Sequence, residues 1–431
     1  MGLLIRGGRV IDPPSGLDRR ADVLVTDGHI AAVEAGIASG EHQVIDARGL
    51  VVAPGLVDMH VHLRDPGQTH KEDIASGTAA AVRGGFTAVA CMPNTTPPLD
   101  HPTVVEYVLS RAAKAGACRV WPIATITKGR MGEELSLIPT LAGSGAVALS
   151  DDGDAVKNAG LLRRAMGYAR QAGLPVIEHC EDAALSNAGV MHEGMWSTVL
   201  GLRGIPSVSE EVIVARDILL AEETGARLHV AHVSTAGSVA LIRQAKRRGV
   251  GVTAEVTPHH LLLTDEAVGD YNTDAKMNPP LRGQADRAAL VEGFLDGTID
   301  AIATDHAPHA PEEKRVEFDC APFGVVGLET ALGVVLTRLV RPGTLPLMEA
   351  LRRLSATPAA ILGRAGGRLE LGAPADLVLI DLERRWTVDP ATFASKSRNT
   401  PFAGWELQGK AVMTIVGGEI KYSDLPVEVD A

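Results

Sequence analysis

The chain has 431 residues, of which 45% are hydrophobic and 22% are charged, so it can bury the core of one large domain and a smaller second one. Its 53 acidic residues outnumber its 41 basic ones and give a formal net charge of −12, which argues against nucleic acid or an anionic membrane as the main partner. No apolar run is long enough to cross a bilayer, no signal peptide is recognisable, and we therefore expect a cytoplasmic protein.

The two ends of the chain share the same texture. Short β-rich runs broken by Gly and Asp occur at 3–8, 21–28 and 44–49, and again at 375–381 and 412–418. Such strands need partners that bury one of their faces. We therefore predict a small β-sandwich domain built from residues 1–54 and 365–431, with residues 55–364 inserted between its halves.

The middle of the chain repeats a different unit, in which an apolar or β-branched run is followed by an Ala-rich helical stretch. Eight strands alternating with helices predict an α/β fold, a (β/α)₈ TIM-type barrel whose chemistry lies at the carboxyl ends of the strands. The long spacing between the fifth and sixth runs predicts an extra helix or excursion. The eight runs are residues 56–62, 86–94, 119–125, 146–152, 175–179, 228–232, 252–257 and 299–305.

Polar side chains follow most of these runs, where the strand ends would converge on one mouth. A single histidine at a strand end is more often structural, but histidines and carboxylates at many separate ends favour a metal site. Four imidazoles with carboxylates suit one or two borderline divalent cations, zinc first. The residues are His60 and His62, Asn94, Asp151 and Asp152, His179, His232 and Asp305.

The stretch DMHVHLRDPG, residues 58–67, adds a cation to this site. Alternate side chains of an extended strand share a face, so we expect His60, His62 and Arg64 to project together. A guanidinium in that position can hold a carboxylate through two hydrogen bonds. The alternative is an ordinary salt bridge from Arg64 to Asp65 or another local acid.

Four motifs carry a family resemblance: HVHLRDPG at 60–67, MPNT at 92–95, MNPPLR at 277–282 and TDHAPH at 304–309. Together they resemble the cyclic amidohydrolases of the amidohydrolase superfamily, and among these the bacterial type I dihydroorotases. The resemblance runs from APGLVD at 53–58 to GAPADL at 372–377. It implies the reversible ring closure of N-carbamoyl-L-aspartate to L-dihydroorotate, the third step of de novo pyrimidine (UMP) biosynthesis.

The same resemblance implies two zinc ions per subunit, bridged by Asp152 and a hydroxide, with Asp305 as the catalytic acid and base. The metal ligands would be His60, His62, Asp152, His179, His232 and Asp305. The substrate-binding residues would be His62, Leu63, Arg64, Asn94, Asn278, His309, Phe323 and Gly324.

One position separates the possible relatives. Many superfamily members bridge their metals with a carbamylated lysine after the fourth strand, whereas ALSDDGD at 148–154 offers carboxylates and no lysine. Matching the family motif favours Asp152 over Asp151 as the bridge, and the alternative for Asp151 is a local role in the turn around Gly153. The pattern departs from that of the hydantoinases and allantoinases.

Two other functions stay open. One is a hydantoinase- or allantoinase-type cyclic amidohydrolase. The other is a non-catalytic, dihydroorotase-like scaffold subunit of aspartate transcarbamoylase, although such relatives have lost ligands that this chain keeps. We expect a small-molecule substrate, no nucleic acid or membrane partner, a homo-oligomer, and a possible complex with aspartate transcarbamoylase.

Overall fold

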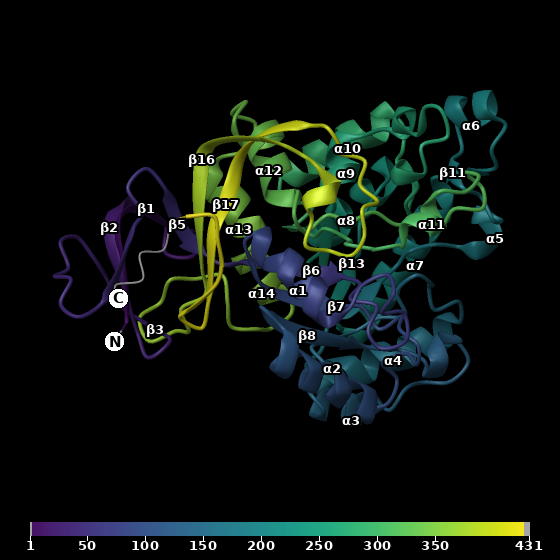
Figure 1. Cartoon of the computed structure of the whole chain (residues 1–431). Coiled ribbons are helices and arrows are strands. Elements are labelled where there is room, and N and C mark those ends of the chain that lie inside the picture. Colours follow the sequence, from purple (N-terminus) through teal and green to yellow (C-terminus); the bar gives the residue numbers. More distant parts are fainter. Residues whose placement is uncertain (1, 426–431) are drawn as a thin grey trace.

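The computed structural model describes residues 2–425, and its centre is a parallel barrel (Figure 1). Its strands neighbour one another in chain order, and the barrel closes where Val61 pairs with His306 and the His62 N–H donates to the His306 carbonyl at 2.8 Å. All eight predicted runs contain a strand, and the predicted TIM-type barrel is confirmed. The strands are β6 (Leu56–Val61), β7 (Phe86–Cys91), β8 (Arg119–Ala124), β9 (Ala148–Leu149), β10 (Val176–Glu178), β13 (Leu228–Val230), β14 (Val252–Val256) and β15 (Ala301–Ile302).

The barrel strands read as continuous apolar runs because both of their faces are buried, as is usual for parallel sheets. One set of side chains, including Leu56 and Val89, packs outward against the helices. The other set includes Met59, Ala90 and Ile177 and fills the interior with many small residues. The barrel is therefore a packed core, and only its ends are free to hold polar groups.

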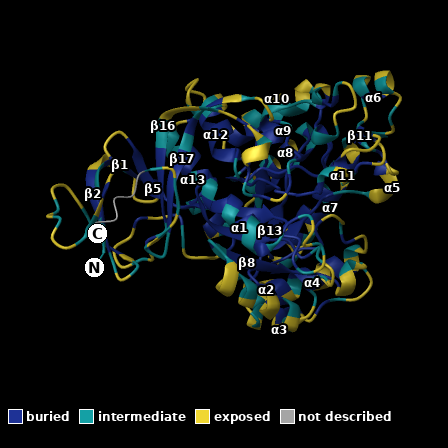
Figure 2. Cartoon of the chain, in the orientation of Figure 1, coloured by how far each residue is buried: buried dark blue, intermediate teal, exposed yellow. Residues whose placement is uncertain are grey.

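Helices cover the outside of the barrel, with their buried faces inward and their exposed faces toward solvent (Figure 2). The predicted excursion between the fifth and sixth strands is confirmed and contains α5 (Ala183–Ser186), β11 (Met191–His192), α6 (Met195–Leu200) and β12 (Gly204–Ile205). No helix within residues 2–425 has both the length and the apolar character that a membrane crossing requires. The remaining α-helices are α1 (Ile74–Arg83), α2 (Pro102–Ala115), α3 (Ile138–Gly143), α4 (Ala159–Ala172), α7 (Val208–Thr224), α8 (Ala236–Arg247), α9 (Pro258–Leu262), α10 (Gln284–Leu295), α11 (Pro311–Lys314), α12 (Ala331–Val335), α13 (Leu347–Arg353) and α14 (Ala356–Ile361).

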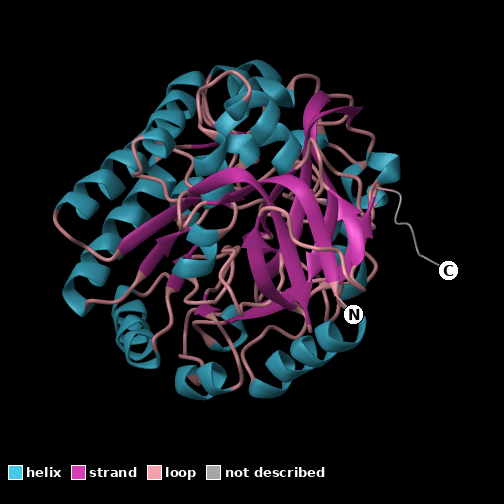
Figure 3. Cartoon of the chain, turned by 90° about the vertical axis from the view of Figure 1, so that its left-hand side faces the viewer, coloured by secondary structure: helices cyan, strands magenta, loops and turns pink. Residues whose placement is uncertain are grey.

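A second sheet is built from both ends of the chain, as expected (Figure 3). Its halves join where β5 pairs antiparallel with β16, with Pro54 opposite Leu377. The strands form one continuous sheet, which is mixed because β1 pairs parallel with β4 and β5, and an apolar cluster from both halves forms its core. Its strands are β1 (Leu3–Asp12), β2 (Leu17–Thr26), β3 (His29–Glu34), β4 (Gln43–Asp46), β5 (Val51–Pro54), β16 (Leu377–Thr387), β17 (Glu406–Val416) and β18 (Glu419–Ser423).

Candidate active site

Histidines and aspartates from five strand ends meet at the carboxyl mouth of the barrel. Two groups of three residues have ligand atoms within 4.8 Å of one another, and His60 belongs to both. The first group is His60, Asp152 and His232, and the second is His60, His62 and Asp305. His179 lies beside them, with its Nδ1 atom 2.9 Å from His232 Nε2. The structure therefore brings together all six residues for which the sequence suggested a metal role.

The donor atoms fit a bound cation. His60 Nε2 and Asp152 Oδ1 are buried, have no hydrogen-bond partner and lie 3.4 Å apart. His62 Nε2 lies 3.1 Å from Asp305 Oδ1 and 3.6 Å from Asp152 Oδ2. Polar atoms buried without a partner are costly, and imidazole and carboxylate groups arranged in this way are typical of sites for divalent metals. These residues therefore fit a divalent metal ion.

The charges of the site depend on its burial. Burial alone would raise the pKa of the Asp305 carboxyl, but the imidazoles of His60 and His62 hold that pKa well below its usual range. Burial and the neighbouring His179 lower the pKa of His232 to about 3. Asp152 is also held in its charged form, because His60 and other imidazoles outweigh the effect of burial on its pKa. Both carboxylates are therefore ready to bind a cation.

Strained backbone marks the same residues. His232 has a φ of 30°, Asp305 a φ of 47° and Arg64 a φ of 57°, all in the left-handed region that non-glycine residues seldom adopt. Strain of this kind costs about 1–3 kcal/mol per residue and is found mainly at functional sites. The fold therefore gives up some stability to orient these three side chains.

The two adjacent aspartates after β9 have different surroundings. Asp152 faces the imidazoles, as described above. Asp151 turns away and accepts hydrogen bonds from the N–H groups of Ile126 and Thr127, at 2.8 and 3.1 Å, and from the Thr127 hydroxyl. Asp151 thus fixes the loop after β8, and of the two only Asp152 is placed to bridge metals.

Side-chain partners hold the outer nitrogens of three histidines, and the sequence analysis did not identify two of these partners, Glu255 and Glu181. Glu255 accepts a hydrogen bond from His60 Nδ1 at 2.6 Å, and neither side chain is exposed to solvent. The Asn94 amide oxygen lies 2.9 Å from His62 Nδ1. Glu181 lies 3.3 Å from His179 Nε2. Such contacts fix the ring orientation of a metal-binding histidine.

Arg64 lies in the site, but not for the reason that the sequence suggested. Strand β6 ends at Val61, so the alternation of a strand does not reach Arg64, and its left-handed backbone turns it instead. The guanidinium donates from Nε to the Pro308 carbonyl at 3.2 Å. No described carboxylate lies within 4 Å of it, so the alternative of a salt bridge to Asp65 is wrong. Burial lowers the Arg64 pKa to about 10, and the group remains charged near neutral pH.

A cavity of about 370 Å³ opens above the ligand groups and has the size of a small-molecule site. The His309 imidazole lines it and contacts the Phe323 carbonyl at 2.8 Å. Gly324 must be glycine, because a Cβ atom there would lie 2.8 Å from the Ala307 Cβ. Of the predicted substrate-binding residues, those that line the cavity are His62, Arg64, Asn94, Asn278, His309, Phe323 and Gly324.

Leu63 is the exception among the predicted substrate-binding residues. Its side chain is 2% exposed and packs in the hydrophobic core between the strands and the helices. It does not line the cavity, because the chain turns after β6 and points this side chain toward α1, where Gly77 makes room for it. The cavity wall also includes Gly153, Ala307 and Pro322, which the sequence analysis did not assign to the site.

Comparison with known proteins identifies the family to which the chain belongs. A model described as dihydro-orotase-like matches residues 49–238, and one described as the amidohydrolase family matches residues 321–422. A dihydroorotase of Pelotomaculum thermopropionicum is 57% identical over 98% of this chain and 99% of the relative. The chain belongs to the dihydroorotase family. A second member, from Syntrophotalea carbinolica, is 54% identical over 98% of this chain and 99% of its own length.

Solved structures related to this family share the whole fold. An L-hydantoinase (dihydropyrimidinase) from Arthrobacter aurescens superposes with a TM-score of 0.88 and 28% identity, covering 100% of this chain and 98% of the other. A dihydropyrimidinase from Brevibacillus agri superposes with a TM-score of 0.87 at 22% identity, covering 98% and 95% of the two chains. These relatives and family models show that the chain is an enzyme of the cyclic amidohydrolase type.

Proposed function

We propose that this protein is a zinc-dependent dihydroorotase that interconverts N-carbamoyl-L-aspartate and L-dihydroorotate in pyrimidine biosynthesis. The observation that carries the proposal is the combination of Asp152 among the imidazoles with the buried cation Arg64 in the same cavity. Both forms of the substrate carry a carboxylate, for which a planar guanidinium is a specific partner.

We infer that His60, His62, Asp152, His179, His232 and Asp305 would hold two zinc ions, with Asp152 as the proposed shared ligand. Bound zinc supplies Lewis acidity, which makes hydroxide available near neutral pH and polarises a carbonyl. The chain's own contribution is to fix the imidazoles through Glu255, Asn94 and Glu181, which lie 2.6, 2.9 and 3.3 Å from their outer nitrogens. The ligand geometry is therefore set before metal arrives.

Asp305 is the proposed proton carrier. In the hydrolytic direction it accepts the proton of the attacking water, and it returns that proton to the ring nitrogen as the carbon–nitrogen bond breaks. Its lowered pKa keeps the carboxylate free of a proton in the resting site, so it can act as a base. Ring closure is the same path in reverse and releases water.

The substrate carboxylate is assigned to Arg64, Asn94 and His309. Arg64 and His309 line one cavity with Asp305, and the Asn94 amide lies between His62 and Asp152. Asn278 is assigned to the ring, and the backbone of Phe323 and Gly324 to the wall behind it. Leu63 can contact the substrate only through its backbone, because its side chain is in the core.

The remaining proposals concern the chain as a whole. We infer that residues 55–364 are the catalytic domain and that residues 1–54 and 365–431 form the second domain, which agrees with the end of β5 at Pro54 and the start of β6 at Leu56. Cytoplasmic location, a homo-oligomer and a complex with aspartate transcarbamoylase stay predictions.

One assay tests the function. The purified protein is analysed for bound zinc, and ring opening of L-dihydroorotate is followed beside hydantoin and allantoin. We expect two zinc ions per chain and turnover of dihydroorotate, lost after chelation and regained with zinc. The fold similarity to an L-hydantoinase makes hydantoin the most informative competitor. Turnover of hydantoin or allantoin but not of dihydroorotate would overturn the substrate assignment. Inactivity despite full metal loading would favour a non-catalytic scaffold subunit.

A further inference from the structure

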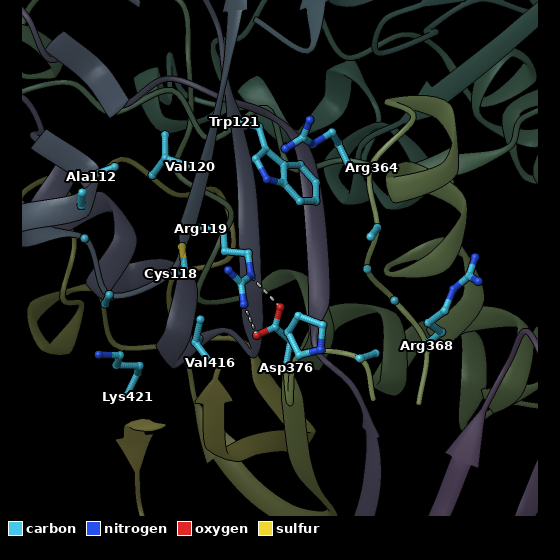
Figure 4. A pocket seen from close by; sticks show the side chains of 18 of the residues that line it. Ala112, Cys118, Arg119, Val120, Trp121, Arg364, Arg368, Asp376, Val416 and Lys421 are labelled. Carbon is cyan, nitrogen blue, oxygen red and sulfur yellow. Dashed lines mark hydrogen bonds and ion pairs between the residues drawn. The ribbon is translucent and has the colours of Figure 1, made fainter. Parts of the chain in front are cut away.

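A second cavity of about 700 Å³ lies at the other end of the barrel, between the barrel and the second sheet (Figure 4). Its walls come from α2, from the start of β8, from the segment 364–376 and from β17 and β18. Arg119, the first residue of β8, lines it, whereas the metal-binding residues lie beyond the opposite ends of the strands. Neither the family resemblance nor the proposed function uses this cavity.

The charged groups around this cavity favour an anion. Among the described residues that line it there are four cations and two carboxylates, although the whole chain has a net charge of −12. Asp376 is fully used, because Arg119 donates two hydrogen bonds to it, at 2.7 and 3.0 Å, and the Gly417 N–H donates a third. Lys421 is paired with Glu419 at 2.5 Å and Arg368 with Glu370 at 3.3 Å, so Arg364 is the cation of this lining that has no carboxylate partner among the described residues.

The loop Arg364-Ala-Gly-Gly-Arg368 carries the free donors. Arg364 is exposed and has no carboxylate within 4 Å in the described part of the chain, while Arg368 has only an exposed partner, Glu370, at 3.3 Å. The N–H groups of residues 365–367 donate no hydrogen bond within residues 2–425. Successive unpaired N–H groups flanked by arginines form the kind of concave surface that binds phosphate.

Glycine is required at the centre of this loop. Gly367 has a φ of 65°, and a Cβ atom there would lie 2.4 Å from the Ala356 nitrogen. A Cβ atom at Gly366 would lie 3.8 Å from the Trp121 ring, so the loop backbone passes close to the indole. The free N–H groups and an aromatic ring are thereby brought to the same cavity.

Trp121 is only 7% exposed, because it packs in the apolar interior of the barrel, and it reaches the cavity with one part of its ring. The Arg364 guanidinium carbon lies 5.9 Å from the centre of its ring, and Figure 4 shows the two groups side by side. Apolar side chains such as Val120 and Val416 complete the wall. Tryptophan and arginine planes both stack on flat heterocycles.

We propose that this cavity binds a nucleotide, with the phosphate on the loop 364–368 and the base against the exposed Arg364 guanidinium, which lies over the Trp121 ring. The volume lies within the range of small-ligand sites, and the position between two structural units is a common one for them. The site is separate from the metal-binding mouth, so a nucleotide bound there leaves the substrate cavity free.

The test titrates the metal-loaded full-length protein with UMP and AMP, by calorimetry and by tryptophan fluorescence, with saturating L-dihydroorotate present so that the substrate cavity is occupied. Inorganic phosphate, ribose 5-phosphate and uridine are the partial ligands. We expect one nucleotide per chain, and binding at least about ten-fold weaker for each partial ligand, because each lacks one half of the recognition. Trp121→Phe removes the fluorescence response if the ligand lies on this ring.

The double variant Arg364→Ala, Arg368→Ala should weaken nucleotide binding by at least about ten-fold and leave turnover and thermal unfolding unchanged. The matched control is Arg338→Ala, because Arg338 is also exposed and lies over a tryptophan, 4.6 Å from the Trp405 ring centre, but does not line this cavity. Equal binding of phosphate and nucleotide, undiminished binding by the double variant, or loss of binding when dihydroorotate is added would each overturn the proposal.

Discussion

The two ends of the barrel hold their charges in opposite ways. At the carboxyl mouth, His60 and Glu255 form a contact of 2.6 Å with no exposure of either side chain. At the amino end, Arg368 and Glu370 are 54% and 65% exposed and lie 3.3 Å apart. Buried, fixed groups suit a reaction centre, because no reorganisation is needed during the reaction, whereas exposed cations can exchange one partner for another at little cost.

The largest effect should follow Asp305→Asn at the mouth. The amide cannot accept and return the proton, so we expect a loss of roughly 10² to 10⁴ in kcat for ring opening of dihydroorotate. The control is Asp154→Asn, because Asp154 is 61% exposed and pairs with Arg130 outside the ligand cluster. Steady-state kinetics compare the two, and near-normal turnover by Asp305→Asn would remove Asp305 from its proposed role.

Glu255→Gln tests whether the fixed partners matter. The amide is a weaker partner for His60 Nδ1, and we expect the zinc affinity to fall about 10- to 100-fold, as measured by competition with a chelator. Glu210→Gln is the matched control, since Glu210 is another buried glutamate but binds Ser234 and Thr235 instead of a histidine of the site. Equal losses in both variants would show general destabilisation instead of positioning.

The buried His309 should make stability depend on pH. Burial, together with the cations Arg64 and Lys71, lowers its pKa from 6.5 to about 3. Below about pH 6.5 the unfolded chain binds a proton at this histidine and the folded chain does not. The contribution of neutral His309 to the free energy of unfolding is therefore fully present above about pH 6.5 and is lost as the pH falls toward 3. In metal-free protein, His309→Gln should flatten this decline by on the order of 1 kcal/mol in chemical unfolding. If the free energy of unfolding of His309→Gln depends on pH just as it does in the parent protein and in the exposed-site variant His70→Gln, the prediction is contradicted.

The smallest effect belongs to Arg119→Lys at the amino end. Lysine keeps the charge but loses the planar two-point contact with Asp376, at 2.7 and 3.0 Å in the structure. We expect a destabilisation below about 1 kcal/mol, seen as a small drop in Tm, with unchanged turnover. A large loss of activity would mean that the two ends are coupled more strongly than their separation suggests.

The sequence predicted the fold and the convergence of the candidate ligand residues because both follow from local patterns. Apolar runs that end in a polar residue gave all eight barrel strands, and the carboxyl ends of these strands brought His60 and Asp305 together although they lie far apart along the chain. Parallel strands in a closed barrel leave few alternatives for where their ends lie. Asp152 was likewise distinguished from Asp151 by the motif, and their different contacts agree with that choice.

Contacts between distant strands could not be predicted in the same way. Glu255 and His229 both lie inside short strands, where the sequence shows only a polar residue in an apolar run, yet they lie 3.2 Å apart inside the barrel. The available signal was Glu255 itself, a carboxylate within an apolar strand, because a carboxylate in a fully buried strand needs a partner. The placement of Arg64 was argued from a strand alternation that ends at Val61, and its left-handed backbone directs it instead. Leu63 was assigned through the family resemblance alone, and its side chain packs in the core.

The junction of β5 with β16 has a consequence for how the chain is made. The pairing of Val51 with Ile380 and of Val52 with Leu379 joins segments that leave the ribosome before and after the whole barrel. Until β16 is synthesised, β5 presents an open edge to which another chain can add. The nascent chain therefore carries this unpaired edge through most of its translation.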